Sequence, residues 1–450
     1  MENQSENQFK VPKKTFLQST TAKMIMVGVL TLVLLIPLNL VQNLIQERSI
    51  RKDDVIKKET QTWGENIHFM GPILKVPVKT YTETEVYDEQ TKTKSIQKQE
   101  ELTYAYFFPE TLQHTTEIEK VDQLKRGIYK PIVFKANLLA KGNFSSLDLQ
   151  KLDCKPEDIL WDKTSVIVKT TDLKSIKSDL KITLNNSQLT LEANADSDAY
   201  FDVLETETFS YQPDVTNPFQ LNIQYNGSNS IEFIPIGKTT ATSIDANWSS
   251  PSFTGTFASN DSTKKITAEN FHADWKIIHV NRPFSQQYLG AIPNLNNYSY
   301  GVKLIEPVDE YQQNERSSKY GFLVIGLTFL VFFLIQTISK VNIHIFQYTM
   351  IGLALIMFYT LLISITEHSS FTLAYAIAAA SVIIMLLLYS VSVLKSTKYA
   401  IFISLSLTAL YSFIYVIIQL EDYALLVGSI GLFLILGAVM YFSRKIDWNN

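Results

Sequence analysis

The distribution of apolar residues divides the chain into two kinds of segment. One long apolar run lies near the N-terminus, and a series of similar runs follows residue 319. Between them, residues 47–318 carry only short apolar stretches among polar and charged positions. A helix needs roughly 20 mostly apolar residues to cross the hydrocarbon core of a bilayer, and the long runs reach this length. The pattern therefore predicts a membrane protein with one large aqueous domain.

Six runs are long enough to span a bilayer and contain no charged residue. Backbone N–H and C=O groups need partners inside lipid, so each run is expected to be a transmembrane helix. The last five runs are separated by only a few residues, which predicts an up-and-down helix bundle in residues 319–443. The expected helices are Met24–Gln46, Tyr320–Ser339, Ile345–Thr366, Ser369–Leu394, Tyr399–Leu420 and Tyr423–Ser443.

The first apolar run has a basic flank, as secretory signal peptides do. Its apolar stretch is long, however, and no small-x-small cleavage site follows before Gln46, so we interpret it as a retained anchor. The following residues, Glu47–Trp63, have helical composition. We expect the helix to continue out of the bilayer to about Trp63, where Gly64 can end it.

Residues 47–318 have the short, alternating patterns of a β-rich (α+β) domain. Phe219–Tyr225 alternates and is followed by Asn226-Gly227 and then by Ile231–Ile236, which predicts a β-hairpin. Two subdomains are an alternative to one, with a boundary near Asp196–Asp198. Further strands are expected at Leu102–Phe108, Ile132–Leu139, Ser165–Thr170, Lys181–Leu184, Leu189–Ala193, Thr239–Trp248 and Lys265–His279, and short helices at Ser145–Leu152 and Asp172–Ser178.

Charge is distributed as unevenly as hydropathy. Residues 47–318 contain 30 Lys and Arg against 38 Asp and Glu, a local net charge of −8, whereas the whole chain carries −4. An acidic domain of this kind excludes a basic nucleic-acid binder, so no nucleic acid is expected as a partner. Cys154 is the single cysteine, which excludes a disulfide framework, and we expect its thiol to be partly buried.

Lys and Arg gather on one side of the predicted membrane. Cytoplasmic loops are enriched in these residues, so the tails 1–23 and 444–450 are expected in the cytoplasm and residues 47–318 outside it. The gaps at Glu367-His368 and Glu421-Asp422 contain no Lys or Arg and should face the outside. The basic residues that define the cytoplasmic side are Lys10, Lys13, Lys14, Lys23, Lys340, Lys395, Lys398, Arg444 and Lys445.

No signature of nucleotide, nucleophile or zinc-dependent catalysis is present. The chain lacks G-x-x-x-x-G-K-[ST], G-x-S-x-G and H-E-x-x-H. His272 and His279 are an odd number of positions apart, which places them on opposite faces of a regular strand and disfavours a shared metal. We therefore predict no enzymatic activity, no cofactor and no metal site.

Two segments are candidates for functional contacts. Glu367 and His368 end a predicted helix at the outer face; they are either an ordinary interfacial loop, which is the simpler interpretation, or a pH-sensitive contact with the outer domain. In the segment Trp248–Gly255, Trp248, Pro251 and Phe253 stand out. Pro and Gly turn chains, so a structural corner is favoured there over a ligand site.

Several segments resemble the CreD family of bacterial inner-membrane proteins, and the resemblance runs through nearly the whole chain. The match is most specific from Arg316 to Ala378. There the apolar helices are interrupted by the residue pairs Gln-Tyr, Phe-Tyr and Glu-His, written QY, FY and EH, at matching places. Other matching segments are IPLNLVQNLIQER near the end of the first run, GPILKVPV at Gly71–Val78, RGIY at Arg126–Tyr129, NWSSPSFTG at Asn247–Gly255 and RKIDW at Arg444–Trp448.

This resemblance implies a multi-pass protein of the bacterial inner membrane, with residues 47–318 in the periplasm. It also implies a role in envelope integrity and envelope-stress response, including colicin tolerance and responses to β-lactams within a two-component regulon. It supplies no catalytic residues.

The sequence is compatible with three functions. The favoured one is a non-enzymatic envelope factor that lies in the lipid bilayer and binds an envelope protein or lipid through its outer domain. The second is a transporter or flippase-like permease component for an apolar or lipid cargo. The third is a membrane enzyme, for which only Glu367-His368 offers part of a site.

The orientation can be tested with single cysteines in a Cys154→Ser background. Because residues 47–318 are predicted outside, Asn260→Cys should react with a membrane-impermeant maleimide added to intact spheroplasts. Lys340→Cys and Lys395→Cys should react only after lysis. Labelling of these two from outside would overturn the predicted orientation.

Overall fold

The computed structural model describes residues 20–444 apart from 89–92, 121–128, 130, 146, 148–151, 153, 195–199, 306–308, 340 and 421–422. The chain forms two compact units. We call residues 1–53 and 308–450 the membrane unit, and residues 54–307 the β unit. The predicted boundary at Asp196–Asp198, residues 126–128 of the motif RGIY and most of the predicted helix Ser145–Leu152 lie outside the described residues.

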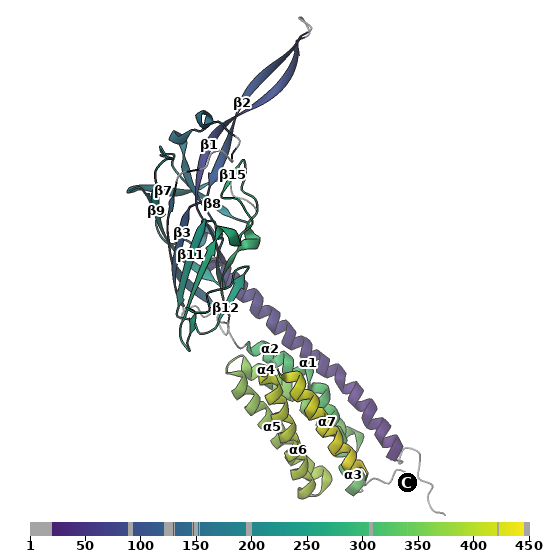
Figure 1. Ribbon diagram of the computed structural model, residues 1–450. Helices are drawn as coiled ribbons and strands as arrows, with labels where there is room; N and C mark the ends of the chain where they lie inside the picture. Colours follow the sequence, from purple (N-terminus) through teal and green to yellow (C-terminus); the bar gives the residue numbers. More distant parts are fainter. Residues whose placement is uncertain are drawn as a thin grey trace, which may run out of the picture. The chain divides into compact units, whose positions relative to one another are not determined.

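Six helices of the described chain are long and apolar enough to cross a membrane, which confirms the predicted fold class. α1 runs without interruption to Trp63, as expected, and the N–H of Gly64 bonds to the carbonyl of Thr60 in its last turn. The helices are α1 Thr20–Trp63, α2 Glu310–Lys319, α3 Gly321–Ser339, α4 Ile345–Thr366, α5 Phe371–Leu394, α6 Thr397–Gln419 and α7 Ala424–Ser443 (Figure 1).

α1 belongs to the core of the membrane unit. It buries Val27, Leu30, Leu34 and Leu38, whose spacing of three and four residues places them on one helix face. Leu38 packs on Gly321 of α3 and Leu34 on Gly352 of α4, so closely that a Cβ at either glycine would clash with the leucine. Small residues permit such close approach of helices in lipid. Removal of α1 would uncover this core.

α2 is a helix that the hydropathy pattern does not reveal, because its sequence EYQQNERSSK is polar. It begins at Asp309, whose carboxylate accepts a hydrogen bond from the N–H of Tyr311 at 2.9 Å. Its buried residues include Asn314, Ser317 and Ser318. α2 contacts α3, α4, α5 and α6, and it therefore belongs to the membrane unit rather than to the outer domain in which the sequence placed residues up to 318.

The β unit is built on one long sheet that folds back on itself (Figure 1). The strands pair in the order β12-β16-β10-β1-β5-β8-β7-β6-β9-β4-β3-β11-β14-β13, with β2 on β1 and β15 on β2. The strands are β1 Ile67–Asp88, β2 Thr93–Phe107, β3 Thr111–Lys120, β4 Val133–Phe144, β5 Ser165–Thr170, β6 Lys181–Leu184, β7 Ser187–Asn194, β8 Asp202–Thr206, β9 Asn217–Ser228, β10 Ser230–Phe233, β11 Thr239–Ala246, β12 Pro251–Gly255, β13 Lys265–Ile266, β14 Phe271–Ile278, β15 Gln287–Leu289 and β16 Tyr300–Leu304.

β1 is the central strand. It pairs parallel with β10 and antiparallel with β2 and β5, and every residue of Gly71–Val78 is buried. Lys75 is the one charged residue in this stretch, and its Nζ lies 2.9 Å from Oε2 of Glu205. Burial lowers the pKa of Lys75, but the hydrogen bond and the charge of Glu205 outweigh it and raise the pKa above its ordinary value. The motif GPILKVPV is thus the buried centre of the sheet.

The predicted hairpin of Phe219–Tyr225 and Ile231–Ile236 is wrong. β9 continues through Asn226 and Gly227 and pairs with β4 and β6, whereas β10 pairs with β1 and β16. Gly227 lies against Ile67 and Phe134, where a Cβ would come within 2.6 Å of either side chain. Packing therefore overrides the turn preference of Asn-Gly, and the chain turns only at Asn229, which has a φ of 58°.

Two further predictions are corrected. Lys265–His279 is not one strand, because the backbone turns at residues 267–270 between β13 and β14, with the N–H of Thr267 bonded to the carbonyl of Asn270. The expected helix at Asp172–Ser178 is only a 3-10 turn, Leu173–Ser175. Cys154 is half-buried against the core of the β unit, as expected.

His114 is buried where the two halves of the folded sheet meet. Its ring stacks on Phe233, with 4.7 Å between centroids, and meets Phe69 edge-on. Nδ1 lies 3.1 Å from Oγ1 of Thr242. Burial lowers the pKa of His114 from 6.5 to about 3, and the backbone of Gly71 only partly opposes this shift. His114 is therefore neutral in the folded protein at any physiological pH.

The buried His114 should make the β unit sensitive to acid. Below pH 6.5 the unfolded chain binds a proton that the folded chain excludes, so stability is lost as pH falls from 6.5 towards 3. From pH 7.5 to pH 5 this residue alone should lower the free energy of unfolding by about 2 kcal/mol. Urea unfolding of the full-length protein in detergent, followed by tryptophan fluorescence, measures the change.

His114→Asn is the control, because asparagine can still bond to Thr242 but does not titrate. Its loss of stability over the same pH interval should be smaller than that of the wild type by about 2 kcal/mol. Identical pH dependence in the two proteins would contradict the assignment of the effect to His114.

Candidate functional site

The segment with Trp248, Pro251 and Phe253 forms a corner and an edge strand. Trp248 is buried, and its Nε1–H donates to the carbonyls of Ser250 at 3.0 Å and Ile305 at 3.2 Å. Pro251 begins β12, which pairs with β16. The half-buried Phe253 meets Trp275 edge-on at 5.9 Å. The contacts of Trp248 and Phe253 are therefore those of packing residues.

Glu367 and His368 have different surroundings in the structure. Glu367 is half-buried; its Oε1 lies 3.8 Å from Nη1 of Arg48 and accepts a hydrogen bond from the hydroxyl of Tyr311 at 3.5 Å. His368 is exposed. Lys52 forms a second ion pair, at 2.9 Å, with Asp309. Glu367 thus joins α4 to α1 and α2 inside the membrane unit, while the imidazole of His368 points to solvent.

Arg316 holds the same end of the bundle together. Its Nη2 donates to the carbonyls of Ile417 at 3.2 Å and Leu420 at 2.8 Å, which end α6. Carbonyls in the last turn of a helix have no intrahelical donor, so a cation there is favourable. Arg48, Arg316 and Glu367 all lie in segments that carry the family resemblance, and their contacts give those segments a structural role.

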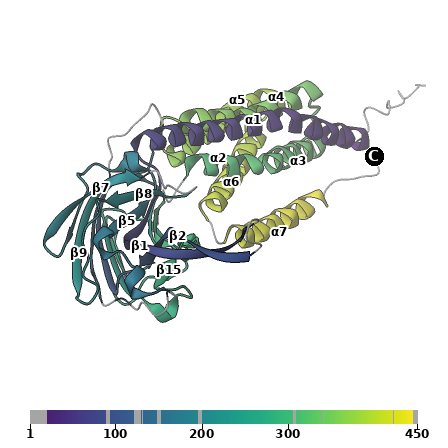
Figure 2. The same cartoon turned by 90° about the horizontal axis from the view of Figure 1, so that it is seen from above.

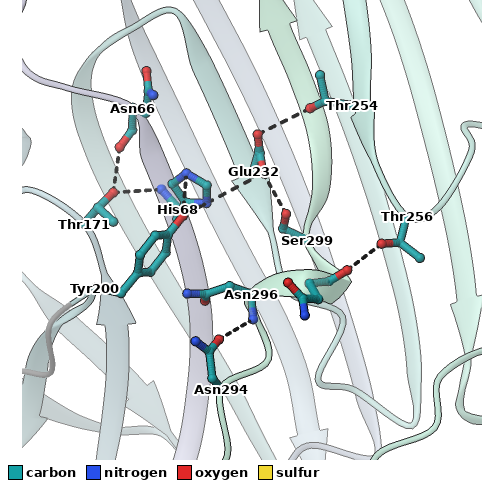
Figure 3. Close-up of polar contacts among 11 residues, drawn as sticks. Asn66, His68, Thr171, Tyr200, Glu232, Thr254, Thr256, Asn294, Asn296 and Ser299 are labelled. Carbon is teal, nitrogen blue, oxygen red and sulfur yellow. Dashed lines mark hydrogen bonds and ion pairs between the residues drawn. The ribbon is translucent and has the colours of Figure 1, made fainter.

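A network of polar contacts in the β unit surrounds His68, as Figure 3 shows. His68 of β1 and Glu232 of β10 are direct cross-strand neighbours, and Nδ1 lies 3.7 Å from Oε2. The hydroxyl of Tyr200 lies 3.1 Å from Nε2 of His68. Glu232 also accepts hydrogen bonds from Ser299 at 2.8 Å and Thr254 at 3.4 Å. We call these five residues the His68 cluster.

Sheet register explains how residues far apart in sequence meet there. Glu232 faces Gly301 of β16, and Gly301 faces Thr254 of β12. The row Thr254–Gly301–Glu232–His68 therefore crosses four strands on one face. At its end the N–H of His68 donates to Oγ1 of Thr171 at 2.9 Å. Further polar residues drawn around the row are Asn66, Thr256, Asn294 and Asn296 (Figure 3).

Two opposing factors act on the pKa of the His68 imidazole. Burial lowers its pKa, and the negative charge of Glu232 raises it; burial is the larger factor, so the pKa lies below 6.5. Burial and Glu232 both raise the pKa of the Tyr200 hydroxyl. His68 is therefore mainly neutral at pH 7, and Tyr200 is protonated.

The order of these groups favours binding over nucleophilic catalysis. In a serine nucleophile site the imidazole lies between the hydroxyl and the carboxylate, because it must accept the hydroxyl proton. Here Glu232 lies between Ser299 and His68, so Ser299 donates to a carboxylate. A surface of hydroxyls, amides, one carboxylate and an aromatic ring suits hydrogen-bonded recognition of a polar ligand.

A second histidine lies on the other half of the sheet, on β14. Nδ1 of His272 lies 2.7 Å from Asp245 and Nε2 lies 2.9 Å from Asp274. The two carboxylates contact opposite nitrogens of the ring. A single metal ion therefore cannot be bound by His272 and both carboxylates in this arrangement. The hydrogen bond to Asp245 is the main factor that raises the pKa of His272 above 6.5. His279 begins a 3-10 turn after β14. Among the described residues, no group of three His, Cys, Asp or Glu is placed to hold a metal.

The sequence pattern does not reveal the His68 cluster. Its members come from β1, β10, β12 and the segments before β8 and β16, and only the pairing of distant strands brings them together. The available signal was indirect: His68 lies three residues before the motif GPILKVPV, and Thr254 lies within NWSSPSFTG.

Comparison with known proteins gives one family. The family model described as "Inner membrane protein CreD" matches residues 19–449. Inner membrane protein CreD of Escherichia coli (strain K12) is 28% identical over 421 residues, which cover 93% of this chain and 91% of that protein. A crystal structure of a candidate nutrient-binding protein from Legionella pneumophila overlaps 50% of this chain and 77% of its own, with 11% identity and a TM-score of 0.24, which is too low to indicate a shared fold.

The balance of factors at His68 predicts the effect of Glu232→Gln. This change removes the negative charge that raises the pKa of His68 and leaves burial in place, so the pKa should fall further. NMR titration of the histidine ring in full-length protein measures it. Asp245→Asn is the matched control: it should lower the pKa of His272 and leave His68 unchanged. A rise in the pKa of His68 in Glu232→Gln would disprove the proposed coupling.

Proposed function

Given that the chain belongs to the CreD family of inner membrane proteins, we propose that it supports cell-envelope integrity as a membrane-anchored binding protein. In this proposal the β unit binds an envelope partner, and the membrane unit anchors it in the inner membrane. Both termini are cytoplasmic and the β unit is periplasmic, which agrees with the basic residues at 395, 398 and 444. The expected conditions of action are envelope stress, including β-lactams and colicins, as the family resemblance implies.

The observation that carries the proposal is the His68 cluster. A polar row that spans four strands, with a half-buried carboxylate at its centre, is costly to maintain unless its hydrogen bonds are made. Glu232 receives hydrogen bonds from Ser299 and Thr254 and faces His68, so its geometry is set before any ligand arrives. Preorganised polar groups of this kind favour specific binding, because little side-chain freedom is lost.

A non-enzymatic role agrees with this site. The matched family is described as a membrane protein rather than as an enzyme. Ser299 has a carboxylate where a nucleophile needs a base, and Glu367 is engaged with Arg48 and Tyr311. The proposed activity is therefore recognition rather than bond cleavage.

One observation favours the alternative of a permease component for an apolar or lipid cargo. Within the membrane unit, a cavity of about 920 Å³ lies between α3, α6 and α7. Its walls are apolar and carry no charge, so coupling to an ion gradient is disfavoured, while an apolar cargo could enter. The two functions differ in which unit is indispensable.

Complementation separates the two functions. In a strain that lacks this gene, full-length His68→Ala with Glu232→Ala should fail to restore growth under detergent and a β-lactam. Loss of a hydrogen bond to a charged group should weaken partner binding roughly tenfold or more. The matched control is His272→Ala with Asp245→Ala, which changes a comparable His-acid pair on the other half of the sheet and should still rescue.

Membrane levels of both variants must equal that of the wild type. Full rescue by the His68-Glu232 double variant would refute binding through the His68 cluster. If rescue were instead lost when the cavity between α3, α6 and α7 is filled, the permease function would replace the proposed one.

A further inference from the structure

We call the cavity between α3, α6 and α7 of the membrane unit the wedge. Its volume of about 920 Å³ lies at the upper end of the roughly 300–1,000 Å³ typical of small-molecule sites. All three helices are among the predicted membrane spans. The wall includes Leu327 and Ile335 of α3, Leu407 and Leu410 of α6, and Leu434 and Ala438 of α7.

The wedge exists because α7 touches the bundle at a glycine and then leaves it. At Gly431 the ring of Phe413 from α6 lies so close that a Cβ would come within 2.0 Å of it. Gly428 has the side chain of Ile417 as its near neighbour. No residue in the apolar span of α7 is buried, and Figure 2 shows this helix set apart from α3, α4 and α5.

The wedge extends to the basic end of the bundle. Its wall reaches Ile338 on α3, Tyr399 on α6 and Val439 on α7. Lys398 directly precedes Tyr399, and Arg444 follows Val439 by five residues; both side chains are exposed. We call this end of the wedge its mouth; two exposed cations so close in the chain to its wall provide an attractive site for an anionic headgroup.

We propose that the wedge binds one anionic phospholipid of the surrounding bilayer. Its acyl chains lie between α3, α6 and α7, and its headgroup phosphate meets Lys398 and Arg444. Three features select this occupant: the cavity lies between membrane-spanning helices, its wall contains no charged residue, and the exposed Lys398 and Arg444 lie close in the chain to wall residues at one end. The proposal does not require the His68 cluster, because the two sites belong to different units.

Lipid retention by the full-length protein tests the proposal. The protein is reconstituted into nanodiscs that contain phosphatidylglycerol and phosphatidylethanolamine in equal amounts, extracted in mild detergent and examined by native mass spectrometry. The wild type should retain one phosphatidylglycerol in preference to phosphatidylethanolamine. Lys398→Gln with Arg444→Gln should weaken retention of phosphatidylglycerol about thirtyfold, since each cation near a membrane surface attracts anionic lipid.

Matched controls separate headgroup and acyl-chain effects from general damage. Arg51→Gln with Lys319→Gln removes two exposed cations at the other end of the bundle and should leave lipid retention unchanged. Ala438→Phe, which fills the wedge, should reduce retention of both lipids, whereas Leu436→Phe, on an α7 residue outside the cavity wall, should not.

Several results would overturn the proposal. Equal retention of both lipids by the wild type would show that the mouth does not select charge. Retention unaffected by Ala438→Phe would place the lipid elsewhere. A dimer that Ala438→Phe dissolves would identify the occupant as a second copy of this chain. None of these results depends on envelope complementation, so failure here and failure of the proposed function are distinguishable.

Discussion

The burial of the segment Gly71–Val78 of β1 on both faces is the constraint on which the β unit depends. Gly71–Val78 is buried, so its backbone groups need partners within the protein, and from Ile73 onward the strand pairs with β5 or β2. Lys75 would be costly in this position without a counter-charge, and Glu205 supplies it. A slip of one residue in β1 would bring Phe69 to the surface in place of His68. The buried core therefore sets the register that places His68 beside Glu232.

In the membrane unit, too, backbone N–H and C=O groups need hydrogen-bond partners, but here the surrounding solvent is lipid. Its apolar helices satisfy their own backbone, and its charged and polar contacts gather where the helices end. Arg316 bonds to the last carbonyls of α6, and Glu367 links α4 to Arg48 and Tyr311. In lipid, apolar burial does not drive helices together, so these polar contacts and the glycine contacts of α1 define the packing.

Features that depend on neighbouring residues in the sequence could be predicted, whereas features that depend on residues distant in the sequence could not. The six spanning helices depend on local composition, and α1 ends at Trp63 as its sequence indicates. The hairpin predicted at Asn226-Gly227 was wrong because Gly227 is packed between Ile67 and Phe134, which are distant in the sequence. The hydropathy pattern does not reveal α2, because its buried residues other than Tyr311 are Asn and Ser. The His68 cluster requires knowledge of which strands pair, and alternation of residue types does not contain it.

The two proposed sites differ in their solvent, which is water for the His68 cluster and lipid for the wedge. This difference determines how each site can select a ligand. The His68 cluster lies in water, where only preformed hydrogen bonds distinguish a binding surface from solvent, so its rigidity determines specificity. The wedge beside α7 lies in lipid, where an uncharged wall costs little and needs no preformed contact. Its selectivity must come from the mouth, at Lys398 and Arg444. A lipid held there would support α7 along the part of its length that Phe413 does not reach, and the lipid would thus be part of the folded membrane unit.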